Sequence, residues 1–252
     1  MEATFTVKAV RKNHPLAGRV AVVTGASSGV GRAIALALAQ EGADVLAVGR
    51  NSEGLVHTVA GARSAAVSTF VADLTIERDL KTLEQHVKET SGKLDILIHS
   101  AGVLYRDKLQ DADIADLDAQ YAINVRAPYL ITQQMIPLLE KARGQIVFIN
   151  SSVGLSVKRA EVGQYAATKH ALKAVADSLR EEVNPKHIRV LTAYLGRTAT
   201  PMQQFLYQEE GRSYRPEVLL QPEDVASVIV HALLLPPTAE VTDICIRPMV
   251  RS

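Results

Sequence analysis

Short apolar runs alternate along the chain with longer segments in which apolar residues recur every three or four positions. The runs are continuous and rich in Val and Ile, which is typical of strands covered by helices on both faces. They lie at 20–23, 44–48, 66–71, 94–98, 146–149, 188–193 and 241–246. Because helical segments separate the runs, the pattern predicts a single α/β domain with seven parallel strands in a doubly wound sheet.

The helical periodicity predicts six main segments, and the longest contains two prolines. Pro128 and Pro137 are expected to bend or break it, because proline lacks the amide that continues a helix. Residues 1–15 carry scattered charges without periodicity, so they are interpreted as a flexible extension before the domain at 16–252. The predicted helices are 30–40, 53–60, 76–89, 113–141, 164–183 and 222–235.

Composition narrows the functional classes. A net charge of +1 gives no basis for a nucleic-acid surface or a polybasic membrane patch. Cys245 is the single cysteine, and no Cys/His group has zinc spacing, so neither an internal disulfide nor a metal site is expected. No apolar stretch approaches the length of a membrane span, and no signal sequence is visible, so a cytoplasmic location is the default expectation.

A glycine-rich segment follows the first strand and opens the first helix. Its sequence is Thr-Gly-Ala-Ser-Ser-Gly-Val-Gly at 24–31. Glycines permit a tight turn and a close approach of the backbone to a pyrophosphate, and the helix start offers free amides. The alternative is a strand–helix turn without a ligand. The candidate phosphate-binding residues are Gly25, Ser27, Ser28, Gly29, Val30 and Gly31.

The second strand ends in Gly49-Arg50. An NAD-selective site has a carboxylate here for the ribose hydroxyls, whereas a guanidinium suits a 2′-phosphate. The alternative is a solvent-facing arginine in a turn. The position therefore favours NADP(H) over NAD(H).

Tyr165 and Lys169 stand four residues apart in the predicted helix 164–183, so they share one face. A nearby cation favours the phenolate and lowers the tyrosine pKa toward working pH. Ser152, thirteen positions before Tyr165, lies in the polar turn after a strand and is expected to reach the same reacting oxygen. Taken alone, the Tyr–Lys pair is equally compatible with two unrelated helix residues.

The glycine segment, Asp73-Leu74, Asn124, Ser152, Tyr165 and Lys169 together resemble the compact, single-domain branch of the short-chain dehydrogenase/reductase family. The resemblance extends from about residue 16 to 248. It implies a single-domain Rossmann fold, a small-molecule substrate and a homotetramer or dimer. Apolar residues of two long helices are expected at the subunit contact, namely Leu130, Met135, Leu138, Leu172, Val175 and Leu179.

The resemblance also implies roles for individual residues. Tyr165 would be the general acid or base, Lys169 would bind the nicotinamide ribose, and Ser152 would polarise the carbonyl. Asn124 would bend its helix and hold a relay water with Lys169. Asp73 and Leu74 would contact the adenine, Asp73 also being a possible helix cap. Further cofactor contacts are implied for Ser100, Ala101, Gly102, Thr198 and Thr200.

Two departures from the family pattern stand out. Ser100 replaces the asparagine that ties neighbouring strands, which is expected to cost some stability but no chemistry. His99 beside it is expected to be packed rather than catalytic. Leu195-Gly196 replaces Pro-Gly after the sixth strand.

The segment 201–220 is expected to form a lid over a mostly apolar pocket. Arg212 and Arg215 could meet an anionic substrate, but beside Glu209 and Glu210 they are interpreted as solvated lid charges. The prediction is an NADP(H)-dependent oxidoreductase acting on a carbonyl or alcohol. A 3-oxoacyl thioester reductase is the specific alternative, and a non-catalytic NADP-binding regulator is the alternative from another class.

Overall fold

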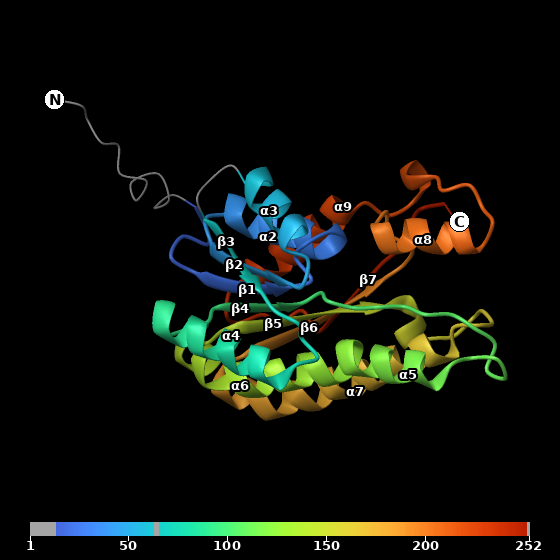
Figure 1. Cartoon of the computed structure of the whole chain (residues 1–252). Coiled ribbons are helices and arrows are strands. Elements are labelled where there is room, and N and C mark those ends of the chain that lie inside the picture. Colours follow the sequence, from blue (N-terminus) through green and yellow to red (C-terminus); the bar gives the residue numbers. More distant parts are fainter. Residues whose placement is uncertain (1–13, 63–65, 251–252) are drawn as a thin grey trace.

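A seven-stranded parallel sheet forms the centre of the molecule (Figure 1). The computed structural model describes residues 14–62 and 66–250, so the predicted extension 1–15 lies outside the described residues except for its last two. The strand order is β3-β2-β1-β4-β5-β6-β7, and every neighbouring pair is parallel. The predicted doubly wound sheet is confirmed. The strands are β1 (Val20–Thr24), β2 (Asp44–Gly49), β3 (Val67–Val71), β4 (Ile96–His99), β5 (Gln145–Ser151), β6 (Arg189–Leu195) and β7 (Asp243–Ile246).

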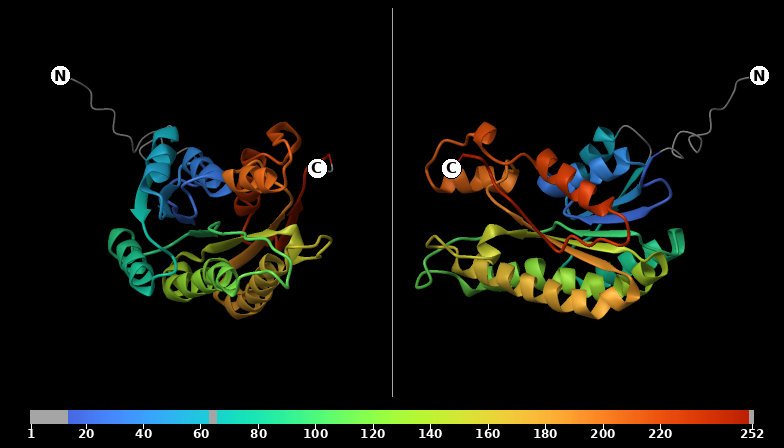
Figure 2. Two further views of the ribbon diagram at one scale, coloured as in Figure 1. Left: turned by 45° about the vertical axis from the view of Figure 1, so that its right-hand side comes forward. Right: turned by 180° about the vertical axis from the view of Figure 1, so that it is seen from behind.

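Helices cover both faces of the sheet, as the views from two directions show (Figure 2). Each face has its own apolar core, because successive strand side chains point to opposite sides. On one face lie α2 (Gly29–Gln40), α3 (Ser52–Gly61) and α9 (Pro222–Leu233). On the other lie α4 (Glu77–Thr90), α5 (Ile114–Tyr121), α6 (Ala127–Ala142) and α7 (Gly163–Val183).

The order of the strands reverses between β1 and β4, which are neighbours although two strands separate them in sequence. From β1 the chain winds outward to β3, then returns to β4 and winds the other way. At such a point the loops that follow the two neighbouring strands run to opposite faces of the sheet. They leave a crevice for a ligand at the carboxyl ends of the strands. The fold therefore places the residues after β1 and β4 at the floor of the candidate site.

The predicted long helix 113–141 is divided rather than simply bent. A π-helical turn, Ala122–Arg126, joins α5 to α6. Pro128 occupies the first turn of α6, where a missing amide costs little. Pro137 lies inside α6 without ending it, so of the two predicted effects, a bend or a break, the break does not occur there.

The lid segment contains a helix that the periodicity did not predict, α8 (Pro201–Glu209), on the same side of the sheet as α2 and α9 (Figure 1). Short 3-10 turns lie at Ser152–Gly154, Asn184–Lys186 and Pro216–Val218. None of the helices in the described ranges is long and apolar enough to cross a membrane.

Four of the apolar residues expected at a subunit contact are instead part of the core. Met135, Leu138, Leu172 and Leu179 are between 0% and 8% exposed and pack between the helices and the sheet. They are not available to a second subunit, so the expectation that they form the contact is wrong.

Candidate active site

A cavity of about 750 Å³ opens at the carboxyl ends of the strands. It is lined by the loops after all seven strands of the sheet and by residues of α8. Among the residues predicted for the cofactor and catalysis, all except Asn124 line this cavity. They are Gly25, Ser27, Ser28, Gly29, Val30, Gly31, Arg50, Asp73, Leu74, Ser100, Ala101, Gly102, Ser152, Tyr165, Lys169, Thr198 and Thr200.

The glycine segment has the shape of a phosphate cradle. Gly25 has φ +67°, and a Cβ there would lie 2.6 Å from the backbone nitrogen of Ala101. A Cβ on Gly31 would collide with the carbonyl oxygen of Gly25. At the start of α2, Ser28 makes no side-chain cap and the first turn has no acidic residue. Its amides and positive dipole end are therefore open to an anion, so the residues present fit a dinucleotide pyrophosphate.

Arg50 and Asp73 lie at the far end of the same cavity, after β2 and β3. Arg50 is exposed and forms no hydrogen bond or ion pair within 14–62 and 66–250. Asp73 accepts hydrogen bonds from the hydroxyl of Thr75 at 2.7 Å and its amide at 2.9 Å, which lowers the Asp73 pKa. Asp73 therefore closes a turn before α4 rather than capping the helix, because the N-cap of α4 is Ile76 and has no side-chain bond, so the predicted cap is wrong. The contact of Asp73 with the adenine stays a prediction.

The tie between β1 and β4 is made by Thr24. Its hydroxyl donates to the Ile98 carbonyl at 3.2 Å and accepts from the amides of Ser100 at 3.1 Å and Ala101 at 3.3 Å. The side chain of residue 100 is not required for this link. The floor of the crevice therefore keeps its hydrogen bonds without the asparagine of the family pattern.

His99 has the packed role that was predicted. Its ring stacks on Phe148 with centroids 4.9 Å apart, and Nε2 lies 2.8 Å from the Thr132 hydroxyl. Burial lowers the His99 pKa to about 3, so the ring is neutral at physiological pH.

Tyr165, Lys169 and a serine hydroxyl meet in the middle of the cavity. Tyr165 and Lys169 lie one helical turn apart on α7, and the Lys169 Nζ is 5.7 Å from the centre of the Tyr165 ring. Lys169 is 4% exposed and donates to the Ile149 carbonyl at 3.1 Å. These contacts bring an ammonium and a phenol to the same wall, as the helical spacing predicted.

The serine whose hydroxyl acts on Tyr165 is Ser151, the residue before the predicted Ser152. The Ser151 side chain lowers the pKa of the phenol, so the two groups are neighbours, and a contact of Ser152 with the substrate oxygen stays a prediction. Ser151 is the last residue of β5, whereas Ser152 starts the following 3-10 turn and is exposed at the cavity edge. Both serines line the cavity.

The pKa of Tyr165 is shifted in the direction opposite to the expectation. Burial raises it to about 12, and the Ser151 side chain offsets only part of that effect. Burial lowers the pKa of Lys169 to about 8, because the ammonium is removed from water. At neutral pH Tyr165 therefore carries its proton and Lys169 is mostly charged.

Asn124 lies behind the cavity wall, within the π-helical turn. Its Oδ1 accepts from the Val103 amide, and its Nδ2 donates to the Val103 carbonyl, each at 2.9 Å. The Nδ2 also donates to Thr168 at 3.0 Å. The side chain fixes the bend in the helix against the loop after β4, but it is fully engaged and does not reach the cavity.

The outer half of the cavity is built from charged side chains that sequence analysis did not connect. Glu210, directly after α8, is only 14% exposed and pairs with Arg106 and Arg197. Arg106, Arg159 and Arg197 line the cavity from the loops after β4, β5 and β6. Arg212 and Arg215 are exposed lid charges, as predicted, and Arg212 in addition forms an ion pair with Glu210 at 3.0 Å.

The chain was compared with known proteins. Residues 19–211 match the short chain dehydrogenase family. An uncharacterised oxidoreductase of Staphylococcus epidermidis is 31% identical over 232 residues, which cover 92% of this chain and 97% of the relative. The chain belongs to the short-chain dehydrogenase/reductase family.

Solved structures of this family share the fold. A short chain dehydrogenase from Shigella flexneri, complexed with NADP, is 29% identical with a TM-score of 0.84, covering 93% of this chain and 99% of that one. A 3-ketoacyl-(acyl-carrier-protein) reductase from Brucella melitensis, complexed with NADH, is 26% identical with a TM-score of 0.79, covering 92% and 98%. This short-chain dehydrogenase/reductase is therefore an oxidoreductase with a Rossmann fold.

Proposed function

We propose that this enzyme is an NADP(H)-dependent oxidoreductase that interconverts a carbonyl and an alcohol. The single observation that carries the proposal is the meeting of Ser151, Tyr165 and Lys169 on one wall of the cavity. A phenol and a serine hydroxyl together can hold one substrate oxygen, and the phenol can exchange a proton with it. A non-catalytic regulator would have no use for this arrangement.

The nicotinamide cofactor would supply or accept the hydride. Gly25 and Gly31 would keep the turn tight enough for the amides at the start of α2 to face its pyrophosphate, and Lys169 would hold the nicotinamide ribose. Arg50 supports NADP(H) over NAD(H), because its exposed guanidinium at the cavity offers several donors to a 2′-phosphate. The relative from Shigella flexneri is an NADP complex, whereas the one from Brucella melitensis is an NADH complex.

Carbonyl reduction is the direction that the protonation states favour. Tyr165 with a pKa of about 12 holds a proton at neutral pH and is ready to donate it to a developing alkoxide. Ser151 would polarise the same oxygen, which is the role first predicted for Ser152. Lys169, charged below its pKa of about 8, would stabilise the phenolate that remains.

Replacement of Tyr165 by phenylalanine tests the proposal. Loss of the proton donor should reduce kcat by roughly 10²–10⁴-fold, because general acid catalysis contributes factors of that size. The affinity for NADPH, measured by nicotinamide fluorescence, should be retained. Tyr129→Phe, an exposed tyrosine on α6, is the matched control and should have unchanged turnover. Turnover of Tyr165→Phe at the wild-type rate, in a screen of ketones and 3-oxoacyl thioesters, would exclude this mechanism.

The screen also separates the specific alternative, a 3-oxoacyl thioester reductase, from reduction of free ketones. A homo-oligomer, which rests on family resemblance, and a cytoplasmic location, which rests on the composition of the sequence, are further parts of the proposal. Light scattering of the purified protein tests the first, since a monomer mass would contradict it. Cell fractionation tests the second, since recovery outside the cytosolic fraction would contradict it.

A further inference from the structure

We propose that the outer half of the cavity binds an anionic group of the carbonyl substrate, a carboxylate or a phosphate remote from the reduced carbon, with Arg159 as its direct partner. This inference rests on the proposed function. It assigns a substrate class to the same cavity.

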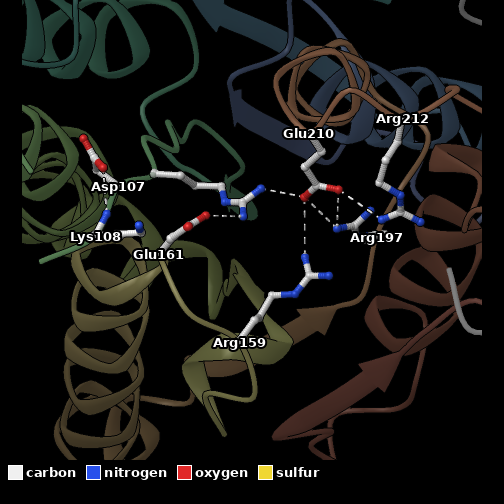
Figure 3. Close-up of polar contacts among 8 residues, drawn as sticks. Asp107, Lys108, Arg159, Glu161, Arg197, Glu210 and Arg212 are labelled. Atoms are coloured by element: carbon white, nitrogen blue, oxygen red, sulfur yellow. Dashed lines mark hydrogen bonds and ion pairs between the residues drawn. The ribbon is translucent and has the colours of Figure 1, made fainter. Parts of the chain in front are cut away.

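The anion site is a cluster of guanidinium groups around one carboxylate, Glu210 (Figure 3). Arg106 contacts Glu210 at 2.5 Å, and Arg197 contacts its two oxygens at 2.9 and 3.1 Å. Arg212 pairs with it at 3.0 Å, whereas the Arg159 nitrogen is 3.9 Å away. The loops after β4, β5 and β6 and the turn after α8 thus each place one arginine beside the Glu210 carboxylate.

Positive charge is in excess at this cluster. Four guanidinium groups face two carboxylates, because Glu161 adds a second negative charge by pairing with Arg106 at 3.2 Å. Among the described residues, the Nε of Arg106 and one terminal nitrogen of Arg197 are buried without a hydrogen-bond partner. The pKa of Arg159 is lowered by burial and by the neighbouring guanidinium groups of Arg197, Arg106 and Arg212. A further anion would relieve this repulsion and use the vacant donors.

Arg159 is the arginine best placed to receive that anion. It lies on the loop between β5 and α7, its side chain is 45% exposed, and it makes no hydrogen bond within the described part of the chain. It lines the cavity that also contains Ser151 and Tyr165. Arg212 is held on the lid and does not line the cavity. A substrate whose oxygen meets Tyr165 would therefore extend its remote end toward Arg159.

The experiment compares acids with their neutral esters. The probes are 3-oxobutanoate, 4-oxopentanoate and 5-oxohexanoate, each with its methyl ester, and dihydroxyacetone phosphate with dihydroxyacetone. We expect the wild-type kcat/KM to favour the charged member of at least one pair. Arg159→Met should reduce kcat/KM for that acid by about 10–100-fold, the range for a lost charge-assisted hydrogen bond, and leave its ester almost unchanged. The two types of anion separate a carboxylate site from a phosphate site.

Arg215→Met is the matched control. Arg215 lies in the lid segment, pairs with Glu217 at 3.1 Å and does not line the cavity. Arg215→Met therefore removes one positive charge, as Arg159→Met does, without changing the site. It should leave both members of every pair unaffected. An equal effect of Arg159→Met and Arg215→Met would reduce the result to a general loss of surface charge and overturn the proposal.

A binding measurement keeps the inference independent of turnover. Calorimetric titration of each acid and ester into the enzyme–NADP+ complex should show preference for the acid, and Arg159→Met should remove that preference. Absence of charge discrimination in both turnover and binding would overturn the anion site and would assign the cluster to closing the lid alone. If Tyr165→Phe retains turnover while acids still bind preferentially, the proposed mechanism fails and the anion site stands.

Discussion

The two halves of the cavity are built by different means. The cofactor half consists mainly of backbone, with glycines that admit a ligand and an uncapped helix start. The outer half consists of long charged side chains from the loops after β4, β5 and β6 and from the end of α8. Backbone geometry recognises a feature common to many ligands, a pyrophosphate, whereas converging side chains can recognise a group particular to one substrate. Ser151 and Tyr165 stand between the halves.

The largest effect on stability and on cofactor binding is expected from adding one methyl group to the cofactor half of the cavity. Gly25→Ala combines a left-handed φ of +67° with a Cβ 2.6 Å from the Ala101 backbone. Strain and overpacking together should cost about 2–5 kcal/mol of the free energy of unfolding. Binding of NADPH, measured by fluorescence titration, should be abolished.

Gly18→Ala provides the control for that experiment, because Gly18 has φ +77° but no atom within 4 Å of its added Cβ. Only the strain of about 1–2 kcal/mol should appear, with NADPH affinity retained. Equal behaviour of the two variants in thermal unfolding and in cofactor binding would show that the close approach to Ala101 does not matter.

A smaller effect is expected at the boundary between the halves. Ser151→Ala removes the hydroxyl beside Tyr165 and should lower kcat by roughly 10²–10³-fold, the size of a lost donor to a reacting oxygen. Ser152→Ala changes an exposed hydroxyl and should have near wild-type turnover. The reverse ranking in steady-state assays would restore Ser152 to the catalytic position.

The side chain that distinguishes cofactors should have a more modest effect. Arg50→Ala should weaken NADPH binding by about 10–100-fold, which corresponds to lost charge-assisted hydrogen bonds, and leave NADH binding nearly unchanged. Dissociation constants for both cofactors provide the measurement. If wild-type enzyme binds both equally, Arg50 is a solvent-facing turn residue.

The smallest effect concerns the stability of the outer half. Glu210 accepts from Arg197 and Arg212, and these contacts hold its pKa below the usual 4.5 although burial acts in the opposite direction. A carboxyl group with a depressed pKa stabilises the fold above its unfolded pKa, and the contribution is lost as pH falls through the folded value. Glu210→Gln should therefore lower Tm at pH 7 by about 4–8 °C, from roughly 2 kcal/mol of charged hydrogen bonds.

The difference in Tm between the wild type and Glu210→Gln should shrink as pH falls below about 4.5, where the unfolded carboxyl is protonated. Glu217→Gln, which changes an exposed carboxylate beside Arg215, is the control and should have little effect at any pH. A constant difference for Glu210→Gln from pH 7 to 3 would show that its charge does not hold the lid.

The cofactor half could be predicted from sequence because its signals are local. The glycine segment is contiguous at 24–31, and Arg50 and Asp73 each follow a recognisable strand. A parallel sheet brings these strand ends to one edge, so identifying the strands also predicts which residues meet. The fold class and most strand positions followed from the same periodicity.

The remaining features depend on contacts that no local pattern encodes. The partners of Glu210 come from positions 106, 159, 197 and 212, and only the folded loops bring them together. The choice between Ser151 and Ser152 depends on where β5 ends, a matter of one residue. The elevated Tyr165 pKa depends on burial, whereas the helical spacing revealed only the neighbouring cation.

The hydrogen bonds of Thr24 alter which positions of the crevice floor are free to vary. The Thr24 hydroxyl forms hydrogen bonds with one carbonyl of β4 and with two amides that follow the strand, so this link between the strands depends on the side chain of residue 24. Residue 100 contributes only its backbone amide to this link, so the link does not require an asparagine side chain at that position. A substitution at residue 100 therefore leaves the link between β1 and β4 in place, whereas loss of the hydroxyl at residue 24 removes it.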